Sequence, residues 1–227
     1  MRSKEIEISG KKLTVHELHD ICDQCTGRAL TGSWVWDSAI YLSEWMASQG
    51  LVEFQIEGKT VVELGAGTGL PGLVAASLGA GRVVLTDVAP LLPGLQRSVE
   101  ANGFSDRVEV RELVWGSDET WLSEVDLVLM SDVFYDTSEM PALAKTLSGL
   151  CGGGTTVWSA SEVRTQTGEC LELLKGEGFG VVELALVPSK AAADDLEEEN
   201  LFAIFLLTPP HLLCSLDKEW SECSARP

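Results

Sequence analysis

Residues 61–72 read Val61-Val62-Glu63-Leu64-Gly65-Ala66-Gly67-Thr68-Gly69-Leu70-Pro71-Gly72, and this stretch decides the fold. The β-branched pair predicts a strand, the alternating glycines a tight turn, and Pro71 the first turn of a helix. Glycine lets the backbone adopt positive φ and approach a ligand without a Cβ between them. The turn therefore directs free backbone N–H groups at the space above the strand end, which suits a nucleotide-like ligand.

The spacing of the glycines selects among such ligands. Dinucleotide-binding turns read G-x-G-x-x-G, whereas this one reads Gly65-x-Gly67-x-Gly69 and follows an acid, Glu63. A carboxylate is unfavourable beside a pyrophosphate, which argues against an NAD-dependent oxidoreductase. A cationic ligand without phosphate fits better, and S-adenosylmethionine (SAM) is such a ligand. A side chain at Gly67 is expected to occupy space that the cofactor needs; a tight turn without a ligand is the alternative.

Strand and helix patterns alternate along the rest of the chain, as in an α/β protein with a parallel sheet. The last two predicted strands are joined by an acidic loop without a helix, which predicts an antiparallel pair. The sequence thus predicts a Rossmann-like, seven-stranded SAM-dependent methyltransferase fold, mostly parallel and closed by a C-terminal antiparallel hairpin. The predicted strands after the turn are 82–87, 108–110, 125–132, 155–160, 179–187 and 201–207, and the predicted helices are 92–101, 138–150 and 163–175.

Three segments follow from this pattern. Residues 1–30 form an N-terminal extension with a possible small hairpin, residues 31–207 the methyltransferase domain, and residues 208–227 a tail. Near the start of the domain, Ser33 or Asp37 is expected to cap a helix that Gly50 ends.

Charge and composition limit the partners. The 227 residues carry a net charge of −19, which argues against nucleic acid and favours a basic partner. No apolar run approaches the roughly 20 residues of a membrane span, and Met1 leads into polar sequence. We expect a soluble monomer in the cytoplasm, with the nucleus as an additional location, and no membrane partner. Cys22 and Cys25 form a C-x-x-C without a second pair, so free thiols are expected rather than a metal site.

Polar and aromatic side chains follow several of the predicted strands. Asp87 ends the second strand, where an acid can accept hydrogen bonds from ribose hydroxyls, and Trp115 follows the third, where adenine can stack. The fourth strand leads into Asp132-Val133-Phe134-Tyr135-Asp136. Asp132 can hold an amine, and Tyr135 can wall an alkylammonium channel through cation–π attraction. Capping and core packing are the alternatives for these residues.

The chain resembles the seven-β-strand protein-lysine methyltransferases of the methyltransferase-like 21 group, within methyltransferase family 16. The resemblance covers roughly residues 30–207. It rests on Val35-Trp36-Asp37-Ser38-Ala39, residues 62–72, Leu85-Thr86-Asp87, Glu112-Leu113-Val114-Trp115-Gly116 and the D-x-x-Y motif Asp132-Val133-Phe134-Tyr135.

The resemblance implies transfer of methyl groups from SAM to a lysine ε-amine of a protein, with S-adenosylhomocysteine as product. Asp132 and Tyr135 would be the catalytic residues that orient the amine. A small-molecule N-methyltransferase and a non-enzymatic SAM-binding module are the alternatives. The implied cofactor-binding residues are Trp36, Glu63, Gly65, Ala66, Gly67, Asp87, Trp115 and Ser131, and no metal is implied.

The acidic loop over 188–200 is a candidate reader of a basic protein surface. It holds five acids and one cation, Lys190. Its position depends on which edge of the sheet the last two strands present, and a solvated loop is the alternative.

Overall fold

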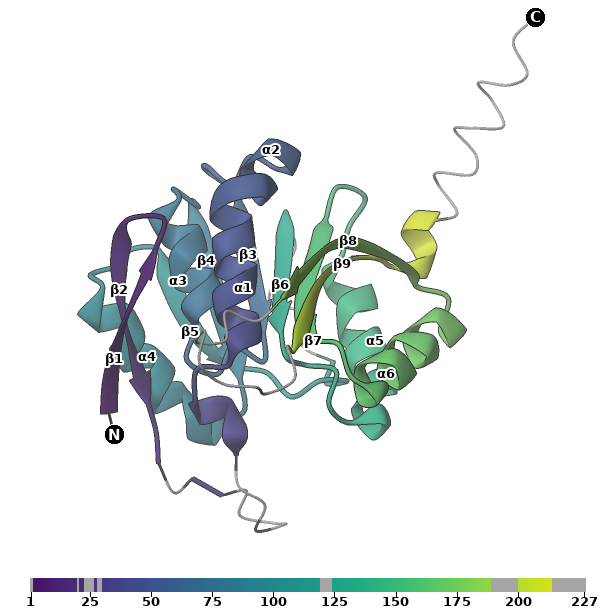
Figure 1. The fold of residues 1–227 in the computed structure, drawn as a ribbon, viewed down its shortest axis with the longest axis horizontal. Coiled ribbons are helices and arrows are strands. Elements are labelled where there is room, and N and C mark those ends of the chain that lie inside the picture. Colours follow the sequence, from purple (N-terminus) through teal and green to yellow (C-terminus); the bar gives the residue numbers. More distant parts are fainter. Residues whose placement is uncertain are drawn as a thin grey trace, which may run out of the picture.

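The computed structural model describes residues 2–19, 21–22, 27, 30–118, 124–188 and 200–213. These residues form a seven-stranded sheet in the order β5-β4-β3-β6-β7-β9-β8 (Figure 1). Strands β5 to β7 in that order are parallel, and β9 runs antiparallel to both β7 and β8. The predicted fold is confirmed. The strands are β3 (Thr60–Leu64), β4 (Arg82–Asp87), β5 (Val108–Glu112), β6 (Leu127–Ser131), β7 (Thr156–Glu162), β8 (Gly180–Pro188) and β9 (Leu201–Thr208).

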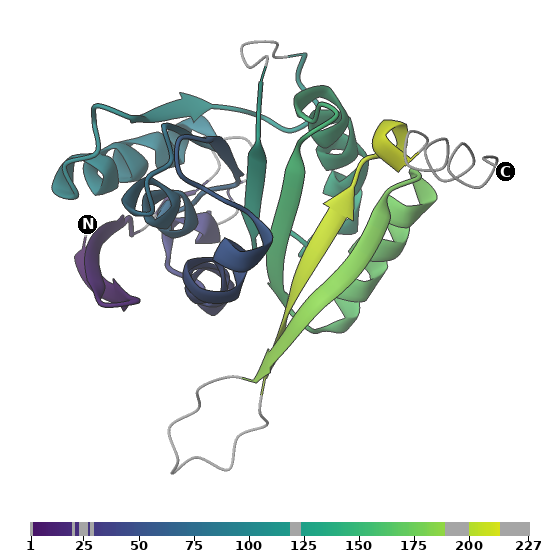
Figure 2. The same cartoon turned by 90° about the horizontal axis from the view of Figure 1, so that it is seen from above.

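Helices cover both faces of the sheet, as the alternation along β3 shows. Val61 packs in a core with helices α1, α3 and α4, whereas Val62 and Leu64 pack in a second core with α5 and α6. Figure 2 shows these two helical layers on opposite sides of the strands. The helices are α1 (Asp37–Trp45), α2 (Leu51–Glu53), α3 (Leu70–Ser77), α4 (Leu92–Ala101), α5 (Met140–Leu150) and α6 (Thr165–Gly176), with the short turns η1 (Thr31–Ser33), η2 (Met46–Gly50), η3 (Ala89–Leu91) and η4 (Thr137–Glu139).

The order of the strands in the sheet indicates where a ligand can bind. The chain moves outward from β3 through β4 to β5, then returns to pair β6 with the other side of β3. Ligands of open α/β sheets bind at the carboxyl ends of the strands beside such a reversal. Here the reversal lies between β3 and β6, so the glycine turn and the Asp132 loop are neighbours.

The N-terminal segment forms the predicted hairpin, β1 (Arg2–Ile8) paired with β2 (Lys11–Glu17). Ser9 and Gly10 both have positive φ, which matches a tight two-residue hairpin turn. The hairpin lies against α4 at the side of the molecule, apart from the large sheet (Figure 1).

Three details differ from the sequence-based expectation. The helix expected to end at Gly50 continues through η2 and α2 to Glu53, because Gly50 itself keeps a right-handed helical conformation. The N-cap of α1 is Trp36 without a side-chain cap; Asp37 is already helical, where its charge complements the helix dipole, and Ser33 bonds Leu30 instead. Strand β7 continues to Glu162, two residues past the predicted end, because β9 pairs with it there.

Within the described ranges no helix is long and apolar enough to cross a membrane, and no group of three or more acidic, His or Cys side chains is arranged to hold a metal. Cys22, Cys151 and Cys170 are free thiols, as expected, while Cys25 lies outside the described residues.

Candidate active site

The turn after β3 depends on glycine. Gly65, Gly67 and Gly69 have φ of +62°, +56° and +81°, values that residues other than glycine rarely adopt. The N–H of Ala66 donates to the carbonyl of Thr86 at 2.9 Å, which ties the turn to β4. Ala66 itself is buried.

The space beside Gly67 is filled by protein. A Cβ at this position would lie 2.3 Å from the carbonyl oxygen of Gly32, in the segment before α1. The expectation that such a side chain would displace the cofactor is therefore incomplete. A larger residue would first force the Gly32 segment away from the turn, so Gly67 variants do not isolate cofactor binding.

Asp87, at the end of β4, holds the glycine turn. Its Oδ2 accepts a hydrogen bond from Gly67 N–H at 2.7 Å and its Oδ1 one from Val88 N–H at 2.8 Å. Burial raises the pKa of Asp87 to about 6, although these two N–H groups act in the opposite direction. A carboxylate offers about four acceptor positions, so Asp87 keeps capacity for ribose hydroxyls.

Glu63 lies beneath the turn, with no exposed surface. Its Oε2 accepts a hydrogen bond from Gly72 N–H at 2.8 Å, which joins β3 to α3. Among the described residues its buried Oε1 has no hydrogen-bond partner. Burial raises the pKa of Glu63 to about 8, and the charge of Asp87 adds to the rise. Glu63 thus supports the turn from below, and its contact with the cofactor stays a prediction.

Trp115 lies against the glycine turn. A Cβ on Gly65 would be 3.2 Å from Cζ2 of the Trp115 ring, which is only partly buried. The next residue is fixed to α5, because Gly116 N–H donates to Thr146 Oγ1 at 2.8 Å. The structure therefore brings Trp115 and the turn together at one edge, as the sequence predicts.

Asp132 follows β6 in a strained backbone conformation, with φ of +54°. Its N–H donates to the carbonyl of Ala160 on β7 at 2.9 Å. Its Oδ1 accepts a hydrogen bond from Nη2 of Arg164 at 2.7 Å, and the side chain is 11% exposed. Strained residues concentrate at functional sites, and this one faces a cavity.

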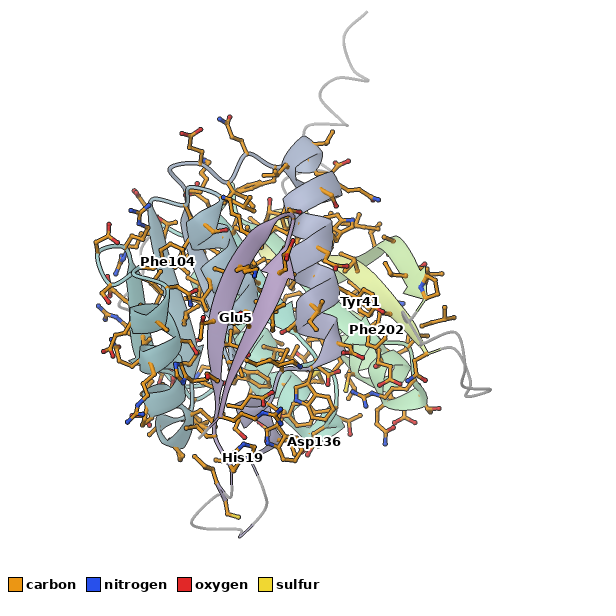
Figure 3. All side chains as sticks on the ribbon, turned by 60° about the vertical axis from the view of Figure 1, so that its left-hand side comes forward. Glu5, His19, Tyr41, Phe104, Asp136 and Phe202 are labelled. Atoms are coloured by element: carbon orange, nitrogen blue, oxygen red, sulfur yellow. The ribbon has the colours of Figure 1, made fainter. Side chains whose placement is uncertain are left out.

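That cavity, of about 240 Å³, brings Asp132 together with Trp36. The start of α1 lies over the ends of β6, β7 and β9, and the rings of Tyr41 and Phe202, 4.6 Å apart, hold it there (Figure 3). Trp36 is 40% exposed, and its Nε1–H donates to the carbonyl of Thr31. The lining residues are Val35, Trp36, Asp37, Ser38, Asp132, Glu162, Asn200 and Phe202.

Two further predicted residues lie at this edge without lining the cavity. Ser131 is the last residue of β6 and is partly buried. Tyr135 is 56% exposed in the loop after Asp132. The predicted channel wall at Tyr135 therefore stays a prediction.

Glu162 and Arg164 were not among the predicted site residues. Both lie beyond the predicted end of the fifth strand at residue 160: Glu162 lies just before the predicted helix over 163–175, and Arg164 lies in its first turn. The rule that functional side chains follow strand ends would have found them, had the strand been extended to Glu162.

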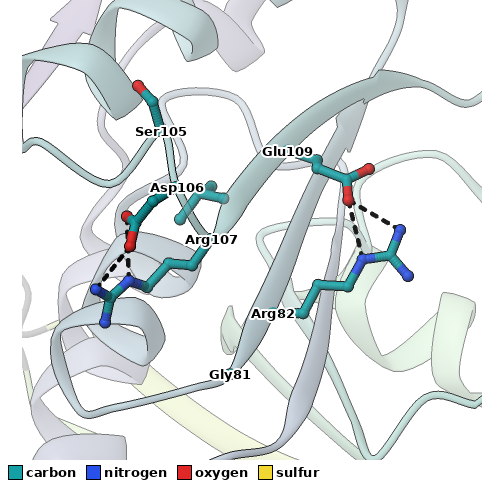
Figure 4. A pocket seen from close by; sticks show the side chains of 7 residues that line it. Gly81, Arg82, Ser105, Asp106, Arg107 and Glu109 are labelled. Atoms are coloured by element: carbon teal, nitrogen blue, oxygen red, sulfur yellow. Dashed lines mark hydrogen bonds and ion pairs between the residues drawn. The ribbon is translucent and has the colours of Figure 1, made fainter.

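A second hollow, of about 250 Å³, lies at the opposite edge of the sheet, where β4 and β5 begin (Figure 4). Its charged side chains are paired with one another: Arg82 with Glu109 at 3.0 Å and Arg107 with Asp106 at 2.9 Å. It brings together none of the predicted site residues.

Comparisons with known proteins identify relatives of the chain. The chain is 39% identical over 155 residues to EEF1A lysine methyltransferase 3 of Mus musculus, a match that covers 67% of this chain and 65% of that protein. The match to EEF1A lysine methyltransferase 3 of Xenopus tropicalis is 39% identical and spans 59% of each chain. That to protein N-lysine methyltransferase METTL21A of Danio rerio is 40% identical and covers 66% of this chain and 69% of the relative.

Solved structures share the fold at low identity. The precorrin-6y C5,15-methyltransferase of Geobacter metallireducens superposes with a TM-score of 0.58 at 12% identity, covering 78% of this chain and 90% of that one. The ribosomal protein L11 methylase of Lactobacillus delbrueckii gives 0.56 at 16% identity, covering 78% and 81%. A family described as lysine methyltransferase matches residues 18–185, and the chain belongs to that family.

Proposed function

We propose that this protein transfers a methyl group from SAM to the ε-amine of a lysine in a protein substrate, releasing S-adenosylhomocysteine. The main observation behind the proposal is that the predicted amine site and the predicted SAM site lie next to each other at the carboxyl ends of the strands. Asp132 lines the cavity with Trp36, and the adjacent Val133 lies 3.4 Å from where a Cβ of Gly65 would be. The loop that brings Asp132 to the cavity thus contacts the glycine turn through Val133.

The turn and its neighbours fit SAM. The positive φ values of Gly65 and Gly67 form the tight turn, Asp87 keeps acceptor capacity for a ribose, and the Trp115 ring beside Gly65 is only partly buried, which suits stacking with adenine. When bound, SAM would supply an electrophilic methyl group on a positively charged sulfonium. Trp36, Glu63, Ala66 and Ser131 are proposed to complete the site.

Asp132 and Tyr135 are proposed to receive the lysine. A lysine amine with a pKa of about 10.4 is neutral roughly once in a thousand at pH 7.4, and only the neutral amine has a lone pair to offer. Asp132 is proposed to bind and aim the amine, with the proton lost to water before transfer. Correct placement of the two reacting atoms then supplies much of the acceleration.

A basic protein surface suits this site. The net charge is −19, and the cavity itself is lined by Asp37, Asp132 and Glu162. Because two similar proteins are named for EEF1A, that protein is the first substrate to assay.

The test is transfer from tritiated SAM to purified EEF1A and to a cell extract, followed by mass spectrometry of the labelled protein. A methylated lysine supports the proposal. Label on free amines alone would show a small-molecule N-methyltransferase, and SAM binding without transfer to any acceptor would show a binding module. Either result would overturn it.

A further inference from the structure

Arg164 occupies a defined place beside the acidic cavity. Its Nη2 lies 2.7 Å from Asp132 Oδ1 and its Nη1 3.5 Å from Glu162 Oε2, so one guanidinium joins two of the lining carboxylates. Arg164 is also the N-cap residue of α6, and its carbonyl accepts a hydrogen bond from Gly168 N–H at 3.2 Å. Backbone and side chain are therefore both held, and the ion pair is a built feature of the site.

The pairing uses one oxygen of Asp132. Within the described residues no hydrogen bond to Oδ2 is present, while Oδ1 is taken by Arg164. Asp132 can thus accept a hydrogen bond from an incoming amine through Oδ2 without releasing Arg164. The guanidinium need not leave for a lysine to bind.

The charges around Asp132 create a chemical difficulty that Arg164 offsets. Asp37 of α1 and Glu162 of β7 line the same cavity, and Asp136 lies in the same loop as Asp132. Glu63 lies on the neighbouring strand β3, where burial raises its pKa and keeps it largely protonated near pH 7, and Asp87 lies one strand further away, at the end of β4. Uncompensated carboxylates stabilise an ammonium, and an opposite charge within about 4–6 Å moves a pKa by about one to three units. A lysine held by such a pocket would stay protonated and unreactive.

We propose that Arg164 is a positioning residue which remains on Asp132 Oδ1 during the reaction, compensates that carboxylate, and so lets Oδ2 hold the target lysine as a neutral amine. This inference rests on the proposed function and names a further residue of the same site. The ammonium gives its proton to water; the amine lone pair then forms the N–C bond while the S–C bond breaks toward sulfur, and the methylated amine leaves as an ammonium.

The test is the pH dependence of kcat between pH 7 and pH 10, which reports the ionisation of the bound amine. The acceptor is EEF1A, or the protein that the wild-type enzyme labels in extract. In Arg164→Gln the ascending limb should move to higher pH by about one unit, so that kcat at pH 7.5 falls about tenfold. KM for the acceptor should stay equal or fall, because the ammonium binds more tightly to an uncompensated carboxylate.

Three other variants sharpen the result. Arg164→Lys keeps the charge and should keep a profile close to wild type. Glu162→Gln removes a negative charge and should move the limb in the opposite direction, to lower pH. Arg82→Gln breaks an ion pair of similar length at the far edge of the sheet, 3.0 Å from Glu109, and should change neither kcat nor the profile.

Several outcomes would overturn the inference. If Arg164→Gln lowers KM with kcat unchanged at every pH, Arg164 only occupies the amine site until the substrate displaces it. An unshifted profile with a lower melting temperature would make it a structural residue. If Arg164→Gln does not fold, Glu162→Gln decides: an unshifted or alkaline-shifted limb refutes the idea. Wild-type enzyme that labels no lysine would instead refute the proposed function itself.

Discussion

At the scale of single residues, the buried carboxyl group of Glu63 couples the stability of the fold to pH. Its pKa is raised to about 8 by burial, whereas an unfolded glutamate titrates near 4.3. Between these values the folded state binds a proton that the unfolded state has lost. The contribution of Glu63 to the free energy of unfolding is therefore fully present below about pH 4.3 and is lost as pH rises toward 8. Asp87, with its pKa near 6, adds a smaller effect of the same sign.

Glu63→Gln is expected to flatten this dependence. The wild-type free energy of unfolding should fall by at most about 1.4 kcal/mol per pH unit from pH 5.5 to 8, which corresponds to several degrees of melting temperature. The variant should lose much less, because its amide does not titrate. Thermal melts across this range measure the difference, with Glu183→Gln on the exposed face of β8 as the matched control. Parallel slopes for wild type and Glu63→Gln would contradict the argument.

At the scale of elements, the N-terminal hairpin is fastened by side chains of one helix. Asn102, after α4, accepts a hydrogen bond from Thr14 N–H at 3.0 Å and donates to the Thr14 carbonyl at 2.7 Å. Ser98 accepts one from His16 N–H at 2.9 Å. These bonds satisfy backbone groups on the edge of β2 that have no strand beside them.

Asn102→Ala should loosen the hairpin without affecting the active edge. Loss of these bonds costs about 1–3 kcal/mol, or a melting temperature lower by about 2–10 °C. Hydrogen exchange should show faster exchange at Thr14 and neighbouring amides of β2, while SAM affinity by calorimetry stays at the wild-type value. Unchanged protection of β2 would show that apolar packing alone holds the hairpin.

The strands and the residues at their ends show which parts of the structure could be predicted from the sequence. The strands along the chain and the acids at their ends follow from local patterns, and these patterns predict Asp87, Trp115 and Asp132 at the edge of the sheet where the structure has them. The length of β7 was not predictable in this way, because its last two residues become strand by pairing with β9, about 40 positions later in the sequence. Arg164 was missed for that reason. Glu63 was recognised as important, but the face of β3 on which it lies follows from packing against α3.

At the scale of the whole molecule, the acidic loop between β8 and β9 is attached at the edge of the sheet that holds the candidate site. Glu162 pairs with Phe202 across β7 and β9, and Asn200 lines the cavity, so the loop between β8 and β9 leaves and re-enters the sheet at the carboxyl edge. The five acids of that loop, Asp194, Asp195, Glu197, Glu198 and Glu199, lie outside the described residues.

Replacing these five acids with Ser or Gln should weaken a charge-guided encounter. Screening acts over about 8–10 Å at physiological ionic strength, so attraction of a basic substrate must fall with salt. The variant should show a higher KM for the protein substrate and a flatter salt dependence of kcat/KM, with SAM affinity unchanged. Wild-type kinetics at every salt concentration would make the loop solvated surface only.

The central claim is that one edge of the sheet holds a SAM site and, beside it, an amine site centred on Asp132. The most direct measurement pairs SAM affinity by calorimetry with the initial rate of lysine methylation in Asp132→Ala, with Asp106→Ala at the opposite edge as control. Loss of a charge-assisted hydrogen bond costs about 1.5–3 kcal/mol, so the rate should fall more than tenfold while SAM affinity is kept. Methylation by Asp132→Ala at the wild-type rate, with SAM still bound, would contradict the account.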